Sequence, residues 1–284
     1  MVHDKQTPEF WNPRAHQQGM VATFRELHAG GCFVIPNPWD VGSARILEQL
    51  GFPALATTSS GFAWTLGHAD NHVTLDEALA HFRAIAMAVD VPVNGDFEGG
   101  FATEPDAVGA NVELAVDTGI AGVSLEDSTG NPADPLFDFA LATERVRAAR
   151  TAIDASGTGV ILTGRSEGFI VGRPDIEETI RRLVAYAEAG ADCLYAPGIK
   201  SKEHIAAVVA AVAPRAVNVL VSSDFTDVRK LEQLGVRRIS VGGALARAAW
   251  GGFFAAAEEI ARHGTFTQLS RAMPFDVING RFAD

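Results

Sequence analysis

Apolar and polar positions alternate along the chain in a repeating pattern. A short run of β-branched and other apolar residues is followed by a polar or glycine-containing loop, and then by a stretch in which Ala, Leu, Glu and Arg recur at helical spacing. This unit occurs eight times. The pattern predicts strands at residues 32–36, 54–58, 91–96, 122–126, 160–164, 193–196, 217–222 and 238–241. It predicts helices at residues 41–50, 75–89, 105–118, 140–156, 175–189, 202–212, 226–234 and 244–262.

Apolar strands that alternate with helices are typical of a parallel sheet covered by helices. Eight repeats predict an α/β fold, a (β/α)8 TIM-type barrel with parallel strands, in one domain over residues 1–284. An open doubly wound sheet is the alternative, but Pro-Asn-Pro-Trp-Asp at residues 36–40 replaces its glycine-rich dinucleotide fingerprint. We expect an extra N-terminal helix within residues 1–30, the barrel at 31–263, and a tail at 264–284 that packs on the barrel or on a neighbouring subunit.

Helix boundaries carry their own signals. Thr74 followed by Glu77 is typical of a capping box, in which each residue satisfies a backbone N–H of the other. Glycines stand where left-handed helix caps are expected, at positions 51, 119, 190 and 235.

Composition and charge exclude several classes of protein. The chain is 47% hydrophobic and 20% charged, and its net charge of −12 would repel a nucleic-acid backbone. The longest apolar stretch, residues 205–221, is interrupted by Pro214 and Arg215, so we expect no membrane span. Residues 1–14 lack the features of a secretory signal, and the expected compartment is the cytoplasm.

The sequence contains no signature of a nucleophilic enzyme. It has no G-x-S-x-G elbow and no P-loop. Cys32 and Cys193 are each surrounded by apolar residues, which is typical of structural cysteines. Lys200 follows the sixth strand and is the candidate for a Schiff base, but a solvated lysine at a helix start is the favoured interpretation.

Acidic residues gather at the carboxyl ends of the third and fourth predicted strands, where a barrel of this kind has its active site. Asp96 and Glu98 lie on the same side of the chain, and Glu126 is followed by Asp127. Converging carboxylates repel one another unless protons or a divalent cation compensate them. Oxygen ligands favour Mg²⁺ or Mn²⁺ over zinc. We therefore predict a metal site at Asp96, Glu98 and Glu126, with helix capping as the alternative.

Two other strand ends carry candidate substrate-binding groups. Arg165 ends the fifth strand, where its guanidinium can hold a substrate carboxylate in bidentate fashion, form a salt bridge to Glu126 or Glu167, or do both. Thr58 and Ser59 follow the second strand and offer hydroxyl and N–H groups to an anion, although a plain loop would have the same composition.

Asp70 lies between His68 and His72 in an expected long loop after the second strand. The two histidines have a zinc-like spacing, but the neighbouring Gly67 and Asn71 argue against a regular helix. Asp70 is therefore interpreted as an outer metal ligand or a loop latch.

A series of motifs follows in order along the chain. It comprises Gly42-Ser43-Ala44-Arg45 within residues 36–50, Thr58-Ser59, Leu66-Gly67 with Asp70, Asp96-Phe97-Glu98-Gly99-Gly100, Leu125-Glu126-Asp127, Gly164-Arg165-Ser166-Glu167, and Gly235-Val236 with Arg247. Together they resemble the isocitrate lyase/phosphoenolpyruvate mutase superfamily from about residue 18 to residue 262. The single motifs are weak, but their ordered series is specific.

The resemblance implies a (β/α)8 barrel, Mg²⁺, a 2-oxo acid or related carboxylate as ligand, and a homo-oligomer, often a tetramer that exchanges its last barrel helix. It implies that Asp96 is the principal metal carboxylate and that Glu98 stands where many members have a second Asp. Glu126 matches the acid that holds metal-bound water. Arg165 matches the arginine that binds the substrate carboxylate and neutralises a developing enolate.

The resemblance extends to further residues around the mouth. Thr58 and Ser59 fall on the turn that takes the substrate's carboxylate or phosphonate, and Asp70 falls on an acid near the metal. Trp39 and Asp40, which follow the first strand, and Asn131, in the loop after the fourth, are further candidate substrate contacts.

The departures from the family pattern concern the proton carrier. Asp-Ser-Thr-Gly-Asn at residues 127–131 replaces the Lys-Lys-Cys-Gly-His loop of the lyases, and the lysine of the mutases is also missing. Ala-Pro-Gly at residues 196–198 replaces a polar pair of the mutases.

We expect a Mg²⁺-dependent enzyme that acts on a 2-oxo or 2-hydroxy carboxylic acid through a pyruvate-type enolate, with Arg165, Asp70 and Glu126 as catalytic residues. A C–C lyase, similar to methylisocitrate lyase or oxaloacetate decarboxylase, is the first interpretation. The alternatives are C–P bond chemistry, a non-catalytic 2-oxo acid binder, and a phosphate-binding barrel suggested by Gly242-Gly243.

Overall fold

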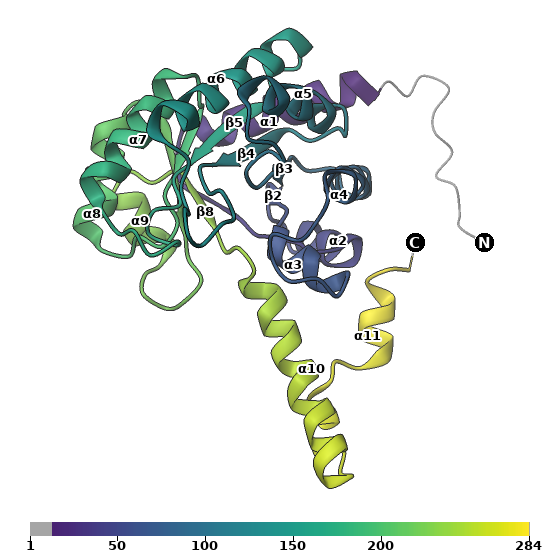
Figure 1. The fold of residues 1–284 in the computed structure, drawn as a ribbon. Coiled ribbons are helices and arrows are strands. Elements are labelled where there is room, and N and C mark those ends of the chain that lie inside the picture. The colour runs from purple at the N-terminus through teal and green to yellow at the C-terminus, as the bar shows by residue number, and fades with distance from the viewer. Residues whose placement is uncertain (1–12, 284) are drawn as a thin grey trace.

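Eight parallel strands form a nearly closed (β/α)8 barrel, as predicted (Figure 1). The computed structural model describes residues 13–283. The strands are β1 (Phe33–Ile35), β2 (Leu55–Ala56), β3 (Val93–Asp96), β4 (Gly122–Glu126), β5 (Ile161–Arg165), β6 (Cys193–Tyr195), β7 (Ala216–Leu220) and β8 (Arg238–Ser240). The sheet order β1-β8-β7-β6-β5-β4-β3-β2 places the seam between β1 and β2.

The helices follow the strands as the sequence predicts, with a short helix added after β2 and two short helical elements in the tail. They are α1 (Pro13–Ala29), α2 (Val41–Gln49), α3 (Ser59–Thr65), α4 (Leu75–Ala88), α5 (Pro105–Val116), α6 (Phe139–Ser156), α7 (Ile176–Glu188), α8 (Lys202–Val212), α9 (Val228–Gln233), α10 (Ala244–His263), the 3-10 turn η1 (Thr267–Arg271) and α11 (Phe275–Gly280). The Thr74–Glu77 capping box is present at the start of α4. The glycines at 51, 119, 190 and 235 all have positive φ, as caps require.

The seam of the barrel is closed by a few polar contacts. The backbone N–H of Ala56 donates to the carbonyl of Pro36 at 3.1 Å. The Asn37 side chain donates to the carbonyl of Thr57 at 2.9 Å, and its oxygen accepts the N–H groups of Val241 and Gly242. Asn37 therefore joins the ends of β1, β2 and β8.

Helix α1 closes the amino-terminal end of the barrel. The Gln17 side chain donates to the carbonyls of Val116 and Ile120, at 2.7 and 2.9 Å. Phe24 is fully buried, and a side chain at Gly122 would approach its ring to 2.6 Å, so only glycine fits in β4 at this point. The predicted N-terminal helix is thus confirmed from Pro13 onward, and its expected earlier part lies outside the described residues.

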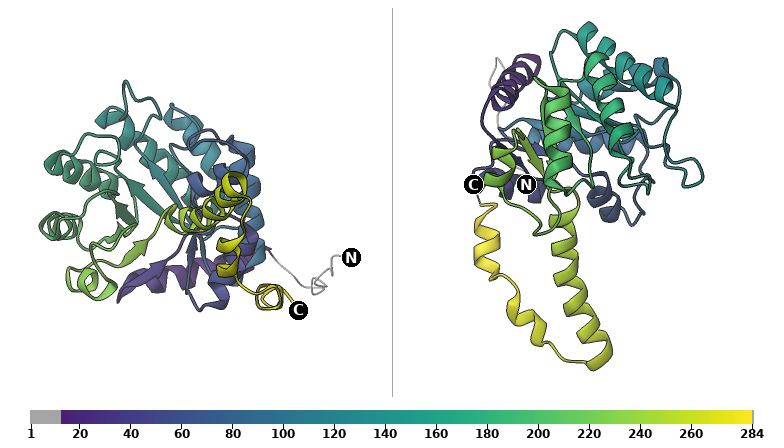
Figure 2. Two further views of the ribbon diagram at one scale, coloured as in Figure 1. Left: turned by 90° about the horizontal axis from the view of Figure 1, so that it is seen from below. Right: turned by 90° about the vertical axis from the view of Figure 1, so that its left-hand side faces the viewer.

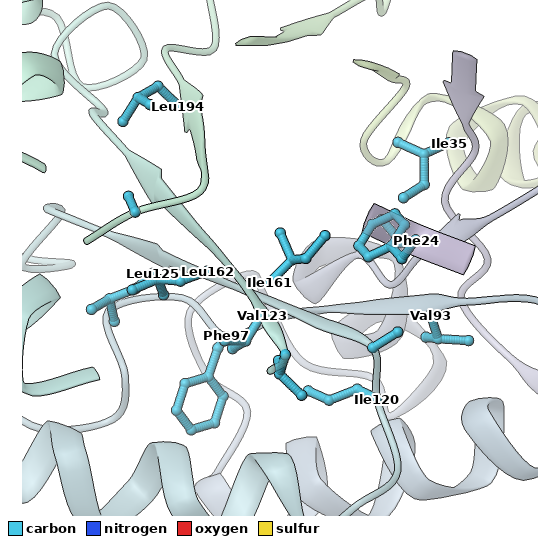
Figure 3. Packing of buried hydrophobic residues seen from close by; sticks show 14 of the residues in the cluster. Phe24, Ile35, Val93, Phe97, Ile120, Val123, Leu125, Ile161, Leu162 and Leu194 are labelled. Atoms are coloured by element: carbon cyan, nitrogen blue, oxygen red, sulfur yellow. The ribbon is translucent and has the colours of Figure 1, made fainter. Parts of the chain in front are cut away.

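Apolar side chains of the strands fill the space between the sheet and its helices (Figure 3). Val123 and Leu162 are fully buried there and Leu125 is 1% exposed, whereas Ile35 and Ile161 lie on the inner side of the sheet, toward Phe24 (Figure 3). The interior of the barrel, in contrast, is polar below the mouth, where Arg238 donates to Asn218 at 2.9 Å and to Thr163 at 3.1 Å. This polar layer lies below the carboxyl ends of the strands, where barrels of this kind bind their ligands.

The turn or loop expected at Thr58 and Ser59 is wrong, because α3 begins at Ser59. Thr58 is the N-cap of this helix, and its hydroxyl accepts the N–H of Gly61. A Ser/Thr-rich run was interpreted as a turn, but it is the capping sequence of a short helix.

Helix α10 forms as predicted but projects away from the barrel instead of covering it (Figure 1). The chain then reverses through η1 and α11 and returns toward the barrel (Figure 2). The Gln49 side chain of α2 donates to the carbonyl of Arg281 at 2.7 Å, and the Arg45 guanidinium lies 5.9 Å from the Phe282 ring centroid. The tail therefore contacts the barrel at α2. Within residues 13–283, no helix combines the length and the apolar character that crossing a membrane requires.

Candidate active site

Arg165 brings three carboxylates together at the mouth of the barrel. Its Nη1 lies 3.2 Å from Asp96 Oδ1 and 3.1 Å from Glu126 Oε2, and its Nε donates to Glu167. The register places Glu126 directly beside Arg165 on the neighbouring strand, while Asp96 comes from β3. The ion pairs predicted with Glu126 and Glu167 are therefore both present, and Asp96 joins them.

One nitrogen of the Arg165 guanidinium, Nη2, remains available to a ligand. Its Nη2 has no hydrogen-bond or ion-pair partner within residues 13–283, whereas Nη1 and Nε are both engaged. The carboxylates that hold the other nitrogens fix the orientation of the planar fork. Such a preorganised donor suits a substrate carboxylate.

The cluster is short of positive charge. Burial raises the pKa of Glu126 well above its usual range, and the nearby Arg165 opposes this shift only in part. Burial also raises the pKa of Glu167, again against the effect of Arg165. One arginine cannot neutralise three carboxylates, so the site favours bound protons or an added cation.

Asp96 is positioned by the end of β2. The hydroxyl of Thr57 accepts the N–H of Asp96 at 2.9 Å, and the N–H of Ser59 donates to Asp96 Oδ2 at 3.0 Å. The predicted Thr58–Ser59 turn therefore lies at the site, but it binds Asp96 through a backbone group, and Thr58 caps α3. Thr57 is a site residue that the sequence reasoning missed, although it stands in the same hydroxyl run.

Glu98 has an unusual backbone and a free carboxyl group. Its φ of +46° lies in the left-handed region, which costs free energy for a residue other than glycine. Burial, followed by the charges of Asp96 and Asp70, raises the pKa of Glu98 to about 8. Its carboxyl makes no hydrogen bond or ion pair with any described residue. Glu98 is thus a ligand-like group beside Asp96.

The remaining predicted residues divide between the site and its surroundings. Partial desolvation and the charge of Asp96 raise the pKa of Asp70, which places this carboxyl next to the cluster. Asp40 accepts the N–H of Ser43 at 2.6 Å as the N-cap of α2, and the half-buried Trp39 precedes it. Asn131 lies exposed in the loop before α6, where its side chain accepts the N–H of Ala133.

Asp127 points away from the mouth. Its carboxylate accepts the Tyr186 hydroxyl at 2.6 Å and the Arg182 guanidinium at 3.2 Å, both from α7, and the N–H of Glu167 at 2.7 Å. It therefore joins β4, α7 and the end of β5.

Tyr195 is the second site residue that the sequence reasoning missed. It ends β6, and its buried ring centroid lies 5.3 Å from the Arg165 guanidinium carbon. The hydroxyl of Ser240 donates to the Tyr195 hydroxyl at 3.5 Å, and burial raises the pKa of Tyr195 to about 12. The tyrosine is therefore a neutral wall of the site. An aromatic residue at a strand end was the available signal.

The residues present fit Mg²⁺ better than a metal that needs a full protein cage. In residues 13–283, no group of three His, Cys, Asp or Glu side chains is arranged to enclose a metal. Mg²⁺ usually takes one or two carboxylates and keeps water or substrate in its other positions. The unpaired carboxyl of Glu98 beside Asp96 matches this donor set.

Comparisons with known proteins identify the relatives of this chain. One is an uncharacterised protein of Mycobacterium tuberculosis, which is 31% identical over 92% of this chain and 96% of its own length. Another is oxaloacetate decarboxylase 1 of Pseudomonas putida, which is 27% identical over 82% of this chain and 81% of its own. A crystal structure of a Burkholderia cenocepacia protein has a TM-score of 0.91 and 45% identity, over 95% of this chain and 98% of that one.

The family assignment follows from the length of the match. The model of the phosphoenolpyruvate phosphomutase family matches residues 24–261, which include every strand of the barrel and the whole acidic cluster. The resemblance seen in the sequence motifs is thereby confirmed. The protein belongs to the phosphoenolpyruvate phosphomutase family.

Proposed function

We propose that the protein is a Mg²⁺-dependent C–C lyase that acts on a 2-oxo or 2-hydroxy carboxylic acid through a pyruvate-type enolate. The observation that carries this proposal is the Arg165 guanidinium, which is held at the mouth by Asp96 and Glu126 with Nη2 left free. The relative named oxaloacetate decarboxylase supports a substrate of the oxaloacetate type. Mn²⁺ would substitute for Mg²⁺ in the same oxygen site.

The residues of the chain would divide the work as follows. Asp96 and Glu98 would hold Mg²⁺, with Glu126 fixing its water, and the ion supplies a Lewis acid for a developing oxyanion. Arg165 would bind the substrate carboxylate through Nη2 and stabilise the negative charge as the C–C bond breaks. Thr58 and Ser59 would contact the other end of the substrate.

Proton transfer would fall to acids with a raised pKa. Burial raises the pKa of both Asp70 and Glu126, which makes these two carboxyls the candidate proton carriers. Decarboxylation of oxaloacetate suits this site, because CO₂ leaves without a proton and the enolate takes one at carbon. That chemistry does not need the cysteine loop that this chain lacks.

C–P bond chemistry is the alternative within the same family, since it releases the same enolate. The loop at residues 127–131 lacks the lysine of those enzymes. Its Asn131 is exposed and bonded within its own loop, which favours the C–C reaction.

Ligand binding tests the proposal before any substrate is known. Oxalate resembles the planar pyruvate enolate, so a site complementary to the enolate should bind it at least roughly a hundredfold more tightly than pyruvate, and only with Mg²⁺ present. The measurement is a thermal-shift titration of oxalate and pyruvate, each with and without Mg²⁺. Equal stabilisation by pyruvate without metal would overturn the mechanism. Trapping by borohydride would instead indicate Lys200, which is exposed.

We also propose that the protein is a homo-oligomer, a dimer or a tetramer. Helix α10 carries exposed apolar residues that the barrel of its own chain does not cover, among them Phe253 and Phe254, which are 58% and 56% exposed. A second copy of the chain is the partner that the family resemblance implies.

A further inference from the structure

A small cavity lies behind the acidic cluster, between β3, α3 and α4. Its apolar lining includes Phe62 and Phe82. Its polar lining is formed by Thr57, Thr58, Ser59, Asp96 and Glu98. His81 of α4 also lines this cavity, and neither the sequence motifs nor the proposed reaction gives it a role.

His81 is held rigidly while one of its nitrogens has no partner. Its ring stacks on Phe62 with centroids 3.9 Å apart and planes inclined by 13°. The residue is 7% exposed, and Nε2 is buried without a hydrogen bond. A buried nitrogen of this kind costs free energy unless something satisfies it. Because burial lowers the pKa of His81 to about 4, the ring is neutral at physiological pH.

Glu98 contributes a second group without a partner to the same cavity. Its carboxyl makes no hydrogen bond or ion pair with residues 13–283, although its backbone adopts the left-handed conformation. His81 and Glu98 therefore both line one cavity, and each carries a polar group for which residues 13–283 supply no hydrogen bond.

The cavity has the size of one water molecule. The volume open to the centre of a water is about 10 Å³, which is close to the minimum for a single buried water. Buried waters usually make two to four hydrogen bonds, and His81 and Glu98 would supply two partners.

We propose that His81 is a positioning residue of the active site, because its Nε2 and the Glu98 carboxyl share one buried water that fixes this carboxyl beside Asp96. The importance of the position rests on the proposed function, in which Glu98 holds the metal ion. The stacked ring provides the rigid end of the arrangement, and the water transmits its position to Glu98.

Two substitutions separate the hydrogen bond from the shape of the ring. His81→Phe keeps the stack on Phe62 and removes the nitrogen, so we expect normal folding and an affinity for Mn²⁺ that is roughly tenfold lower, as for other residues that orient metal ligands. His81→Gln keeps a nitrogen near the position of Nε2 and should retain most of the affinity. Mn²⁺ is titrated and the free ion followed by electron paramagnetic resonance.

His28→Phe is the matched control. His28 is half-buried and also has a buried, unpartnered Nε2 beside phenylalanine rings, but it packs at the opposite end of the barrel against Phe24 and Phe33. Its substitution should leave the affinity for Mn²⁺ unchanged. An equal loss in both variants, or none in His81→Phe, would overturn the inference.

A crystal structure of the wild type decides the same point without metal. It should show one water within hydrogen-bond distance of both His81 Nε2 and the Glu98 carboxyl, and this water should be absent from His81→Phe. A dry cavity would overturn the inference. If the wild type binds no Mn²⁺ but the water is present, the proposed function fails and the positioning of Glu98 stands.

Discussion

At the scale of single residues, Arg165 determines the charge state of the site. It pairs with Asp96, Glu126 and Glu167, yet keeps Nη2 for a ligand. The same residue thus stabilises the empty site and is available to substrate. Its two roles can be separated by a substitution that keeps the charge and changes the geometry.

Arg165→Lys should weaken oxalate binding in the presence of Mg²⁺ by about 1.5–3 kcal/mol, because a single ammonium group cannot keep the pairs with the carboxylates and also offer the ligand the charged donor that Nη2 supplies. Calorimetry of oxalate binding measures this loss. Arg181→Lys, at an exposed pair with Glu178 on α7, is the control and should bind oxalate normally. Equal affinity in the Arg165 variant would return this residue to a purely structural role.

Glu98 should make the stability of the metal-free protein depend on pH. Its pKa is raised from 4.5 to about 8, so its protonated form favours folding below pH 4.5, and this contribution is lost as the pH rises through 8. Relative to Glu98→Gln, the unfolding free energy of the wild type should fall between pH 5 and pH 8. In the presence of Mg²⁺, the wild type should no longer lose unfolding free energy relative to Glu98→Gln between pH 5 and pH 8. Urea unfolding at both pH values tests this, and parallel pH profiles would contradict it.

The sequence was sufficient to predict the residues that meet through strand ends. Asp96, Glu126 and Arg165 follow from the rule that parallel strands deliver their carboxyl ends to one mouth. Thr57 and Tyr195 did not follow, because their roles depend on which neighbour a side chain meets across the barrel. His81 was beyond prediction for the same reason, since its helix packs outside the sheet.

At the scale of elements, the outer network of Asp127 joins strand to helix. Arg182 and Tyr186 of α7 both bind this carboxylate, which also accepts the N–H of Glu167. The network therefore holds the end of β5 against the helical layer. It supports the backbone that carries Arg165 without facing the substrate.

Tyr186→Phe should lower the unfolding free energy by about 1.5–3 kcal/mol, because it removes a buried hydrogen bond of 2.6 Å to a carboxylate. The affinity for oxalate should change little, since Asp127 keeps Arg182 and the N–H of Glu167. Urea unfolding and calorimetry give the two values. If oxalate affinity fell in proportion to stability, the network would belong to the binding site itself.

Periodicity predicted the long elements and failed where local chemistry decides. The eight strands and their main helices follow from the spacing of apolar residues. Helix α3 has only seven residues, so the hydroxyl run at its start was indistinguishable from a turn. Its formation depends on the Thr58 cap and on packing against the barrel, neither of which is visible in the pattern.

At the scale of the whole molecule, α10 stands out because its apolar surface is not covered by the barrel of its own chain. Its amphipathic pattern predicted a barrel helix, but the pattern cannot specify which barrel the helix covers. The half-buried Trp250 and the exposed Phe253 and Phe254 form an aromatic cluster on its surface. Exposed apolar groups of this kind mark association surfaces.

Replacing both Phe253 and Phe254 with Glu should convert an oligomer into monomers, because two charges would be buried without partners in the interface. Sedimentation velocity measures the mass, and circular dichroism checks that the barrel is intact. Glu258→Gln, which removes an exposed charge from the same helix, should leave the mass unchanged. A monomeric wild type would contradict the proposed assembly.

The seam between β1 and β2 is the junction at which the barrel opens most easily. Seven of the junctions between strands are continuous ladders, whereas this one depends on Asn37 and a single backbone bond. Thermal fluctuations that separate neighbouring strands therefore require the least free energy at this seam. Thr57 and Ser59 come after β2 and hold Asp96 in place, so each such fluctuation displaces this carboxylate, which the proposed metal site requires. Asn37 holds the seam closed through its hydrogen bonds, and the rigidity of the site therefore depends on a residue that need not touch the ligand.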